Sequence, residues 1–537
     1  MKRRKFLQGA AALASVVTLT KPTSAFTVTT RAAQPAFELE ELTITQLQQA
    51  MASGRFSSKS LVSKYLSHIS DIDRDGPKLN SVLELNPEAT AIAERLDDER
   101  KSGRVRGPLH GIPLLIKDNL DTADRMTTTA GSLALLGSHR TRDSFVAQKL
   151  REAGAVLLGK TNMSEWANIR SSKSSSGWSA RGGQTRNPYI LDRNPCGSSS
   201  GSGVAPAANL CAAAIGTETD GSVVCPSSAN SLVGIKPTVG LVSRSGIIPI
   251  SHTQDTAGPM ARTVEDAAIL LGAIAGIDAR DAATKSSAGK FHTDYTKFLD
   301  RDGLRGVRLG VARKHFGFND AVDKLMTEAI AAMKRLGAVI IDPADIPTVG
   351  KFDESELEVL LYELKADLNS YLAAAGNSVP VHSLKEIIEF NEKNRDREMP
   401  FFGQDLFIKA QAKGPLTSRA YLAALRKNHL LSRSQGIDFV IRQHRLDAMI
   451  APTGGPAWPT DLLNGDHFTG GYSSPSAVAG YPHITVPAGY VHGLPVGLSF
   501  FAGAWSEPKL ITYAYAFEQA TRARKPPKSL KTVALDA

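Results

Sequence analysis

Pro195-Cys-Gly-Ser-Ser-Ser-Gly-Ser-Gly203 and, a little further on, Gly216-Thr-Glu-Thr-Asp-Gly-Ser-Val-Val-Cys-Pro226 are the segments that decide how this sequence folds and works. They place Ser198 and Ser222 on glycine-rich backbone, which lets amide groups come close to a reacting atom. Upstream, Lys117 ends an apolar run. A serine becomes a good nucleophile only when a base removes its proton, and a lysine in a desolvated site can be that base. The segments therefore contain the parts of a Ser–Ser–Lys hydrolase that needs no histidine.

Each of these residues also has a simpler interpretation when it is considered alone. Lys117 could be a surface lysine at a strand end, and Ser198 or Ser222 could be a turn serine. Ser199 is the centre of a Gly-x-Ser-x-Gly pattern, but a nucleophile elbow needs a preceding strand, and residues 187–195 are polar and bounded by prolines. Cys225 is more simply a buried, inert cysteine than a nucleophile.

Composition predicts a globular protein, and the length exceeds that of one typical domain. The chain has 537 residues, of which 42% are hydrophobic and 22% are charged, as in ordinary globular proteins. Apolar strand-like runs alternate with amphipathic helical patterns, which favours a mixed sheet with helices. We expect strands at 82–85, 112–116, 155–159, 232–236, 247–250, 484–487 and 496–501, and helices at 87–102, 144–153, 203–214, 321–335, 354–374 and 508–521.

The first 25 residues have the pattern of an export signal. A basic start with the pair Arg3-Arg4 precedes an apolar stretch at 9–20 and small residues at 23–25. Paired arginines followed by Phe6 and Leu7 are typical of a twin-arginine signal. We therefore expect a signal segment at 1–25, a leader at 26–37, a precursor carried by the twin-arginine export machinery, and a periplasmic or secreted enzyme. The apolar stretch is too short for a stable membrane span; an ordinary basic N-terminus or a lipid-facing anchor is the alternative.

The remaining organisation follows from charge and cysteine count. The net charge is +10, and much of it lies in the signal segment and in residues 521–537, which we interpret as a basic, solvated tail. No basic face with interleaved aromatics is evident, so we expect no nucleic-acid partner. Three cysteines are an odd number, which argues against a disulfide framework. No metal-ligand spacing appears, so we expect no metal and no cofactor.

Taken together, the motifs resemble the amidase signature family over about residues 40–520. The similarity implies an α/β fold in which a central, mixed, twisted sheet is covered by helices on both faces, within a domain at 38–520 whose more helical section at about 280–450 forms a cap or one rim of the pocket. The motifs that carry it are 106–113, Lys117-Asp118-Asn119, 159–163, Ser198-Ser199, Asp220-Gly221-Ser222, 234–238, 255–259, 479–482 and 493–497.

The run from Ser174 to Pro188 looks similar to one branch of that family, the bacterial peptide amidases, which remove the C-terminal amide from peptides. The resemblance implies a serine hydrolase that cleaves carboxylic amides to the acid and ammonia, with C-terminal peptide amides or amino-acid amides as substrates. Three alternatives stay open: a small aliphatic or aryl amide amidase, the subunit that supplies ammonia for tRNA-dependent amidation, and a catalytically silent binding protein on the same scaffold.

The resemblance also implies a role for each residue of the site. Ser222 would attack the amide and carry the acyl group, Ser198 after a cis peptide at Gly197 would relay the proton, and neutral Lys117 would accept it. The backbone amides around the oxyanion would be those of Thr219, Asp220, Gly221 and Ser222, while Ser199 and Glu218 would hold the loops. The chain departs from many family members at Cys196, Ser200 and Val224, which with the 170–188 loop we expect to govern substrate choice.

Overall fold

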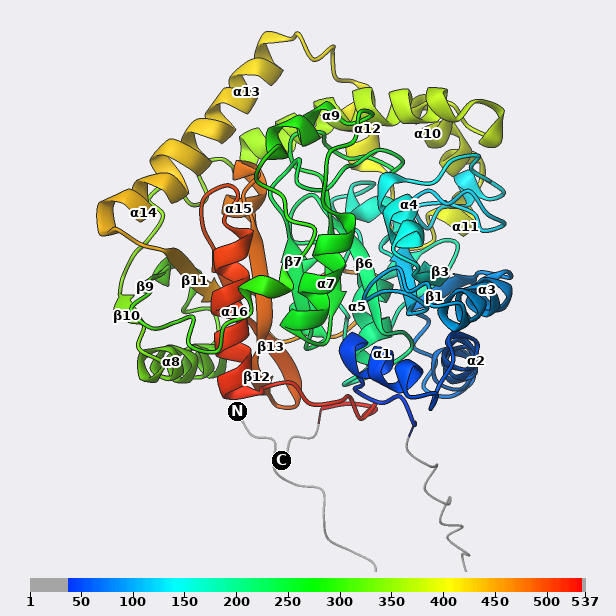
Figure 1. The fold of residues 1–537 in the computed structure, drawn as a ribbon. Helices are drawn as coiled ribbons and strands as arrows, with labels where there is room; N and C mark the ends of the chain where they lie inside the picture. Colours follow the sequence, from blue (N-terminus) through cyan, green and yellow to red (C-terminus); the bar gives the residue numbers. More distant parts are fainter. Residues whose placement is uncertain (1–36, 534–537) are drawn as a thin grey trace, which may run out of the picture. The chain divides into compact units, whose positions relative to one another are not determined.

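A mixed sheet of eleven strands runs through the molecule (Figure 1), with the order β1-β3-β2-β6-β8-β7-β12-β13-β11-β9-β10. The computed structural model describes residues 37–533, so the predicted signal segment lies outside the described residues. From Leu39 onward the chain forms one unit. The strands are β1 (Val82–Leu85), β2 (Pro113–Lys117), β3 (Val156–Thr161), β6 (Ala213–Glu218), β7 (Val233–Lys236), β8 (Thr256–Ala261), β9 (Arg308–Val311), β10 (Val339–Ile341), β11 (Ala448–Pro452), β12 (His483–Val491) and β13 (Leu494–Phe501).

The sheet contains a block of antiparallel pairings between blocks of parallel ones, which confirms its mixed character. β2 pairs in parallel with β3 on one side and β6 on the other, whereas β8, β7, β12 and β13 pair antiparallel with their neighbours. The central strands β2, β3 and β6 are buried over their whole length. Near-continuous apolar runs are typical of such strands because both faces are covered.

Helices cover the sheet on both faces. α7 (Val264–Ile274) and α16 (Glu507–Thr521) pack against each other and against β8, β12 and β13, and both are visible in front of the sheet in Figure 1. α5 (Ser200–Ala207) and α6 (Val224–Ala229) pack against each other and against the central strands. The other early helices are α1 (Ile44–Ala52), α2 (Ser58–His68), α3 (Ala89–Lys101) and α4 (Phe145–Glu152).

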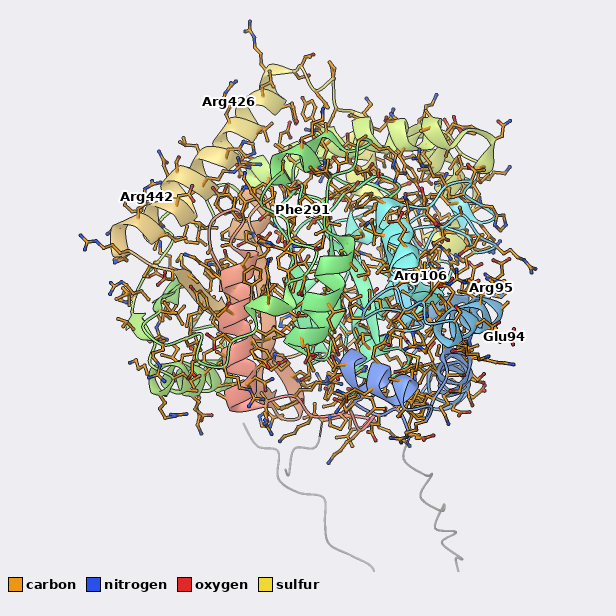
Figure 2. All side chains as sticks on the ribbon, viewed as in Figure 1. Glu94, Arg95, Arg106, Phe291, Arg426 and Arg442 are labelled. Atoms are coloured by element: carbon orange, nitrogen blue, oxygen red, sulfur yellow. A yellow bond between two sulfur atoms is a disulfide. The ribbon has the colours of Figure 1, made fainter. Side chains whose placement is uncertain are left out.

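The later part of the chain forms a helical section at one end of the sheet and also adds strands to the sheet. Its helices are α9 (Asp353–Ala375), α10 (Leu384–Lys393), α11 (Arg395–Glu398), α12 (Asp405–Gln411), α13 (Arg419–His429) and α14 (Asp438–His444), followed by α15 (Ser474–Ala479). The earlier helix α8 (Asp320–Arg335) packs instead against β12 and α16 (Figure 1). Within this later part of the chain, β9 and β10 extend the sheet at its edge. Figure 2 shows Arg426 and Arg442 on the outer side of α13 and α14, pointing away from the sheet.

Two predicted elements are wrong. The segment 203–214 is not one helix, because α5 ends at Ala207, Asn209 adopts a left-handed conformation at φ 58°, and β6 starts at Ala213. Residues 247–250 form no regular strand. Their backbone is held by other groups: the Ile248 N–H donates to the Asn119 carbonyl and the Ile250 N–H to the Asp255 carboxylate. A short run of apolar residues carries no period that would distinguish these cases.

The basic tail is not simply solvated. Arg524 forms an ion pair with Glu41 at 2.7 Å and donates to the Ser231 carbonyl at 2.7 Å. Its side chain is only 11% exposed, and the Leu530 N–H donates to the Tyr189 carbonyl. The tail is therefore anchored to the domain through Arg524, whereas its other basic residues, Arg522, Lys525, Lys528 and Lys531, are exposed as expected for a solvated segment. Among the described residues, none of the helices combines the length and the apolar character needed to cross a bilayer.

Candidate active site

Lys117 is placed by strand β2, of which it is the last residue and which is buried over its whole length. Its neighbours β3 and β6 run parallel to it, so all three strands end at the same edge. Lys117 and Glu218 are the last residues of β2 and β6. Because the carboxyl ends of parallel strands meet at one edge, the loops that follow them build a common site.

Within residues 37–533, the Lys117 amine hydrogen-bonds to hydroxyl and carbonyl oxygens and to no carboxylate. Its Nζ lies 2.8 Å from Ser198 Oγ, 2.9 Å from Thr217 Oγ1 and 3.3 Å from the Thr217 carbonyl. The side chain is fully buried. Burial lowers the pKa of Lys117 to about 7, and the charges of Asp255 and Glu218 oppose this shift only in part. A lysine in this setting can hold or release a proton near neutral pH.

Ser198 lies on a tightly packed loop that precedes α5. The Gly197–Ser198 peptide bond is cis, and a side chain at Gly197 would have no room, since its Cβ would lie 2.2 Å from Ser164 Oγ. The Ser198 carbonyl accepts from the Ser164 N–H at 3.1 Å. The Ser198 side chain is fully buried, and its hydroxyl contacts Lys117 Nζ.

Ser222 lies on the loop between β6 and α6, with 8% of its surface exposed. Glu218 fixes this loop, because its Oε2 accepts from the N–H groups of Val223 at 2.8 Å and Val224 at 3.0 Å. Gly221 takes a left-handed conformation with φ 78°, which favours glycine at this turn. The loop therefore presents Ser222 at the start of α6.

Ser199 links the two serine-bearing loops. Its backbone N–H donates to the Ser222 carbonyl at 3.2 Å. Its hydroxyl donates to the Thr217 carbonyl at 3.0 Å and accepts from the Thr217 N–H at 3.1 Å. The structure thus joins Lys117 to Ser198 by a hydrogen bond. Ser199 joins the Ser198 segment to the backbone of Ser222, while Ser222 itself is not among the residues that line the cavity beside Ser198.

The backbone amides of the Ser222 loop are available for an oxyanion. Within residues 37–533, the N–H groups of Asp220, Gly221 and Ser222 donate to no protein acceptor, whereas those of Val223 and Val224 are taken by Glu218. Neighbouring free amides at a turn before a helix form a concave donor surface for a negatively charged oxygen. Thr219, the fourth residue predicted here, uses its hydroxyl to donate to Asp255 at 2.6 Å.

A cavity of about 400 Å³ opens beside Ser198. Asp255 and Thr219 lie in its wall, and burial raises the pKa of Asp255 to about 6 although the Thr219 hydroxyl opposes the shift. The apolar part of the wall comes from the segment 247–250 and from the last turns of α9, namely Ile247, Ile248, Ile250, Tyr371 and Ala374.

Sequence reasoning missed part of this wall. Thr217 and Asp255 lie within motifs of the sequence, but no role was predicted for either. Nothing in the sequence of α9 marks it as a pocket wall. The 170–188 loop was expected to govern substrate choice, yet none of its residues lines this cavity. It packs instead beside the Ser198 loop, where Gly177 N–H donates to Ser164 Oγ at 2.9 Å. The expectation for that loop is therefore not supported by the cavity.

Cysteine pairing differs from the prediction. Cys196 and Cys225 form a disulfide, and Cys211 is a free, buried thiol. The odd count excluded only a framework that uses every cysteine; it left room for one bond and one thiol. Cys225 is therefore neither free nor a nucleophile.

One group in the described part of the chain has the composition of a metal site. Oxygen and nitrogen atoms of His252, Glu363 and Asp367 lie within 4.8 Å of one another. His252 Nδ1 lies 2.8 Å from Asp367 Oδ2, and Glu363 already accepts from the hydroxyl groups of Thr253 and Tyr421. Burial would lower the pKa of His252, but the hydrogen bond to Asp367 and the charge of Glu363 raise it. A cationic histidine between two carboxylates accounts for this group as an ion pair.

Comparison with known proteins identifies the family. A family model described as Amidase matches residues 60–511. The chain belongs to the amidase family. This amidase is 45% identical over 502 residues to a protein of Arabidopsis thaliana described as a probable amidase, with 92% of each chain covered.

Solved structures agree with the fold. The structure matches the native peptide amidase of Stenotrophomonas maltophilia with a TM-score of 0.88 and 51% identity, covering 92% of this chain and 99% of that chain. The amidase is also 40% identical over 526 residues to a putative amidase of Schizosaccharomyces pombe, covering 92% of this chain and 88% of the relative. The α/β fold with a mixed sheet and the assignment as an amide hydrolase are thereby confirmed.

Proposed function

We propose that this amidase hydrolyses C-terminal peptide amides or amino-acid amides to the acid and ammonia, through an acyl-enzyme at Ser222. The 51% identity with a peptide amidase over almost its whole length supports the substrate class. The observation that carries the mechanism is the fully buried Lys117, whose Nζ lies 2.8 Å from Ser198 Oγ.

Acylation begins with the removal of one proton. Neutral Lys117 accepts the proton of Ser198, and Ser198 takes that of Ser222 as the Ser222 Oγ attacks the amide carbonyl. The carbonyl oxygen becomes an oxyanion, which the free N–H groups of the 219–222 loop surround. Removing one such donor typically costs about 3–4 kcal/mol in the barrier.

The proton that Lys117 has accepted also completes the acylation step. Protonated Lys117 returns it through Ser198 to the leaving nitrogen, the C–N bond breaks, and ammonia departs while the acyl group remains on Ser222. Water then attacks the ester, and the Ser198–Lys117 pair takes its proton and returns it to Ser222. The acid is released and the enzyme is restored.

Substitution of the nucleophile tests the mechanism. We expect Ser222→Ala to lower kcat/KM by about 10⁴-fold or more, because no other hydroxyl can carry the acyl group. Ammonia release from an N-acylated dipeptide amide measures this, with Ser227→Ala in α6 as the matched control. Turnover at the wild-type rate in Ser222→Ala would rule out the acyl-enzyme at this position.

The substrate class needs a separate measurement. Ammonia release from N-acylated dipeptide amides and amino-acid amides should exceed that from acetamide and benzamide. Preference for the two small amides would favour the alternative of an aliphatic or aryl amide amidase. If a fluorophosphonate does not label Ser222, the alternative of a catalytically silent binding protein is favoured.

We also propose that the chain is exported with its 1–25 segment as a twin-arginine signal, and that it works in the periplasm or outside the cell. Arg3 and Arg4 before an apolar stretch support this. Replacing both arginines by lysine should retain the precursor in the cytoplasm, as seen by cell fractionation. A cytoplasmic wild-type protein with residues 1–25 intact would instead favour a role in tRNA-dependent amidation.

A further inference from the structure

The disulfide between Cys196 and Cys225 joins the two segments that carry the serines. Cys196 lies just before the Gly197–Ser198 peptide bond, and Cys225 lies in the first turn of α6, three residues after Ser222. The bond holds the Cα atoms of Cys196 and Cys225 6.0 Å apart, and so ties the segment of Ser198 covalently to the segment of Ser222.

Each cysteine is held firmly to its own serine segment. The Cys196 N–H donates to Asn194 Oδ1 at 2.8 Å, and its carbonyl accepts from Ser200 Oγ at 2.7 Å. The Cys225 N–H donates to the Gly221 carbonyl at 2.8 Å. Because these hydrogen bonds are local, a displacement of either sulfur moves the backbone next to a catalytic serine.

A second link runs beside the disulfide and makes no covalent bond. The Asn230 side-chain amide donates to the Pro195 carbonyl at 2.9 Å and to the Pro226 carbonyl at 2.7 Å. These carbonyls belong to the residues next to the two cysteines. With the disulfide broken, Asn230 still holds the segments together, so we expect them to loosen while the fold persists.

We propose that the Cys196–Cys225 disulfide positions Ser198 against Ser222, and that a dithiol which reduces it slows the acylation of Ser222. The inference rests on the proposed function. One thiolate of the dithiol attacks a sulfur of the bond and forms a mixed disulfide; its second thiol then displaces the remaining cysteine. Two electrons and two protons pass from the dithiol to the protein, which gains two thiols while the dithiol becomes a cyclic disulfide.

The three cysteines differ in exposure, and this difference lets a reductant act on the disulfide while Cys211 stays inert. Cys225 is partly exposed, whereas Cys196 is 5% exposed and packs with Trp458. Cys211 is fully buried, and burial raises the pKa of its thiol to about 12. Cys211 therefore stays inert in the folded enzyme and serves as an internal control.

The experiment compares the oxidised full-length enzyme with the same enzyme treated with dithiothreitol. We expect kcat for an N-acylated dipeptide amide to fall about tenfold with little change in KM, because a misplacement of about 1 Å is enough for such a loss. Reoxidation should restore kcat. Cys211→Ser should respond like the wild type, and the double variant Cys196→Ser/Cys225→Ser should have low kcat and no response.

Several outcomes would overturn the proposal. One is an unchanged kcat when thiol counting on the denatured enzyme shows that all three cysteines are reduced; another is a wild-type kcat in the double variant. Loss of the circular dichroism signal on reduction would show that the bond maintains the fold rather than the site. If the double variant does not fold, the measurement on reduced wild type still decides.

Failure of the proposed function can be distinguished from failure of the positioning role of the disulfide. If the oxidised enzyme releases no ammonia from any peptide amide, the substrate proposal is wrong, but the rate of Ser222 labelling by a fluorophosphonate still reports on the serine. We expect that rate to fall on reduction; an equal rate in both redox states would contradict the positioning role.

Discussion

Two buried lysines on neighbouring strands differ in their surroundings more than in their position. β2 and β3 pair in parallel, so Lys117 lies opposite Thr161 and Ile116 lies opposite Lys160. Both lysine side chains are fully buried. Burial lowers the pKa of both.

The groups around each lysine indicate that Lys117 carries a proton, whereas Lys160 is a counter-ion of nearby carboxylates. Lys160 Nζ donates to the Leu120 carbonyl and to Thr128 Oγ1 at 2.9 Å, and several carboxylates, those of Asp118 and Asp121 foremost, oppose its pKa shift. Lys117 faces the hydroxyl of Ser198, which can take and give a proton. Carboxylates favour the charged form of an amine, so the residue without a close carboxylate is the better base.

Replacement of Lys117 by methionine is the strongest test of this difference. We expect Lys117→Met to lower kcat/KM by about 10³- to 10⁴-fold, because a general base of this kind contributes about that much. The free energy of unfolding should change little, since methionine fills the same buried space without a charge. Ammonia release and urea unfolding measure the two quantities. Residual activity near that of the wild type would assign the base to another group.

Lys160→Met should have the opposite profile. Removal of this cation takes one positive charge away from Asp118 and Asp121, which keep Arg181 and Arg140 as ion-pair partners. The cost should therefore lie at the lower end of the about 3–5 kcal/mol that is typical when a buried ion pair is broken. We expect a fall of about 3 kcal/mol in the free energy of unfolding in urea, with most of the activity retained in the folded fraction. A stable Lys160→Met enzyme without activity would show that Lys160 belongs to the catalytic group.

The pH profile of the wild type tests the protonation of Lys117. The base must be neutral, so kcat/KM should be low below its pKa and rise about tenfold per pH unit up to a midpoint near 7, the pKa of about 7 that burial gives to Lys117. A midpoint near 10 would mean that the lysine keeps its ordinary pKa in the free enzyme.

Thr217→Val gives the smallest expected effect. Thr217 Oγ1 accepts from Lys117 Nζ at 2.9 Å and so stabilises the charged amine. Without it, we expect the acid limb of kcat/KM to move to lower pH by about half a unit, as the loss of one hydrogen bond predicts. Asn119, whose amide also donates to Thr217 Oγ1, makes Asn119→Ala the matched control. A shift to higher pH would contradict the assigned direction.

The fold could be predicted where the apolar pattern has a clear period. The strands ending at Lys117 and Thr161 and the long helices α8, α9 and α16 lie within a few residues of their predicted places. The segments 203–214 and 247–250 could not be assigned, because short runs of small or apolar residues suit a helix, a strand or a cavity wall equally well. The conformation of residues 247–250, for example, depends on hydrogen bonds to Asn119, which is distant in the chain, and to Asp255, which lies outside the run.

The candidate site, too, could be predicted from the sequence only in part. The motifs predicted the residue types Lys117, Ser198 and Ser222, and their roles stay predictions until the variants are measured. The cavity wall from α9 and the contacts of Thr217 had no local signal. The disulfide could not be predicted from the count of cysteines, because pairing depends on which segments the fold brings together.

The sequence by itself determined the chemistry that is available: a lysine at the end of an apolar strand and two serines on glycine-rich loops, in an order similar to that of the amidases. The tertiary structure alone decided that Lys117 contacts Ser198, that Ser199 and the disulfide join the segments of Ser198 and Ser222, and that Lys117 is removed from water. The reason is physical. A pKa shift by desolvation comes from atoms of many distant segments packed around one nitrogen, and no local pattern of residues records that packing.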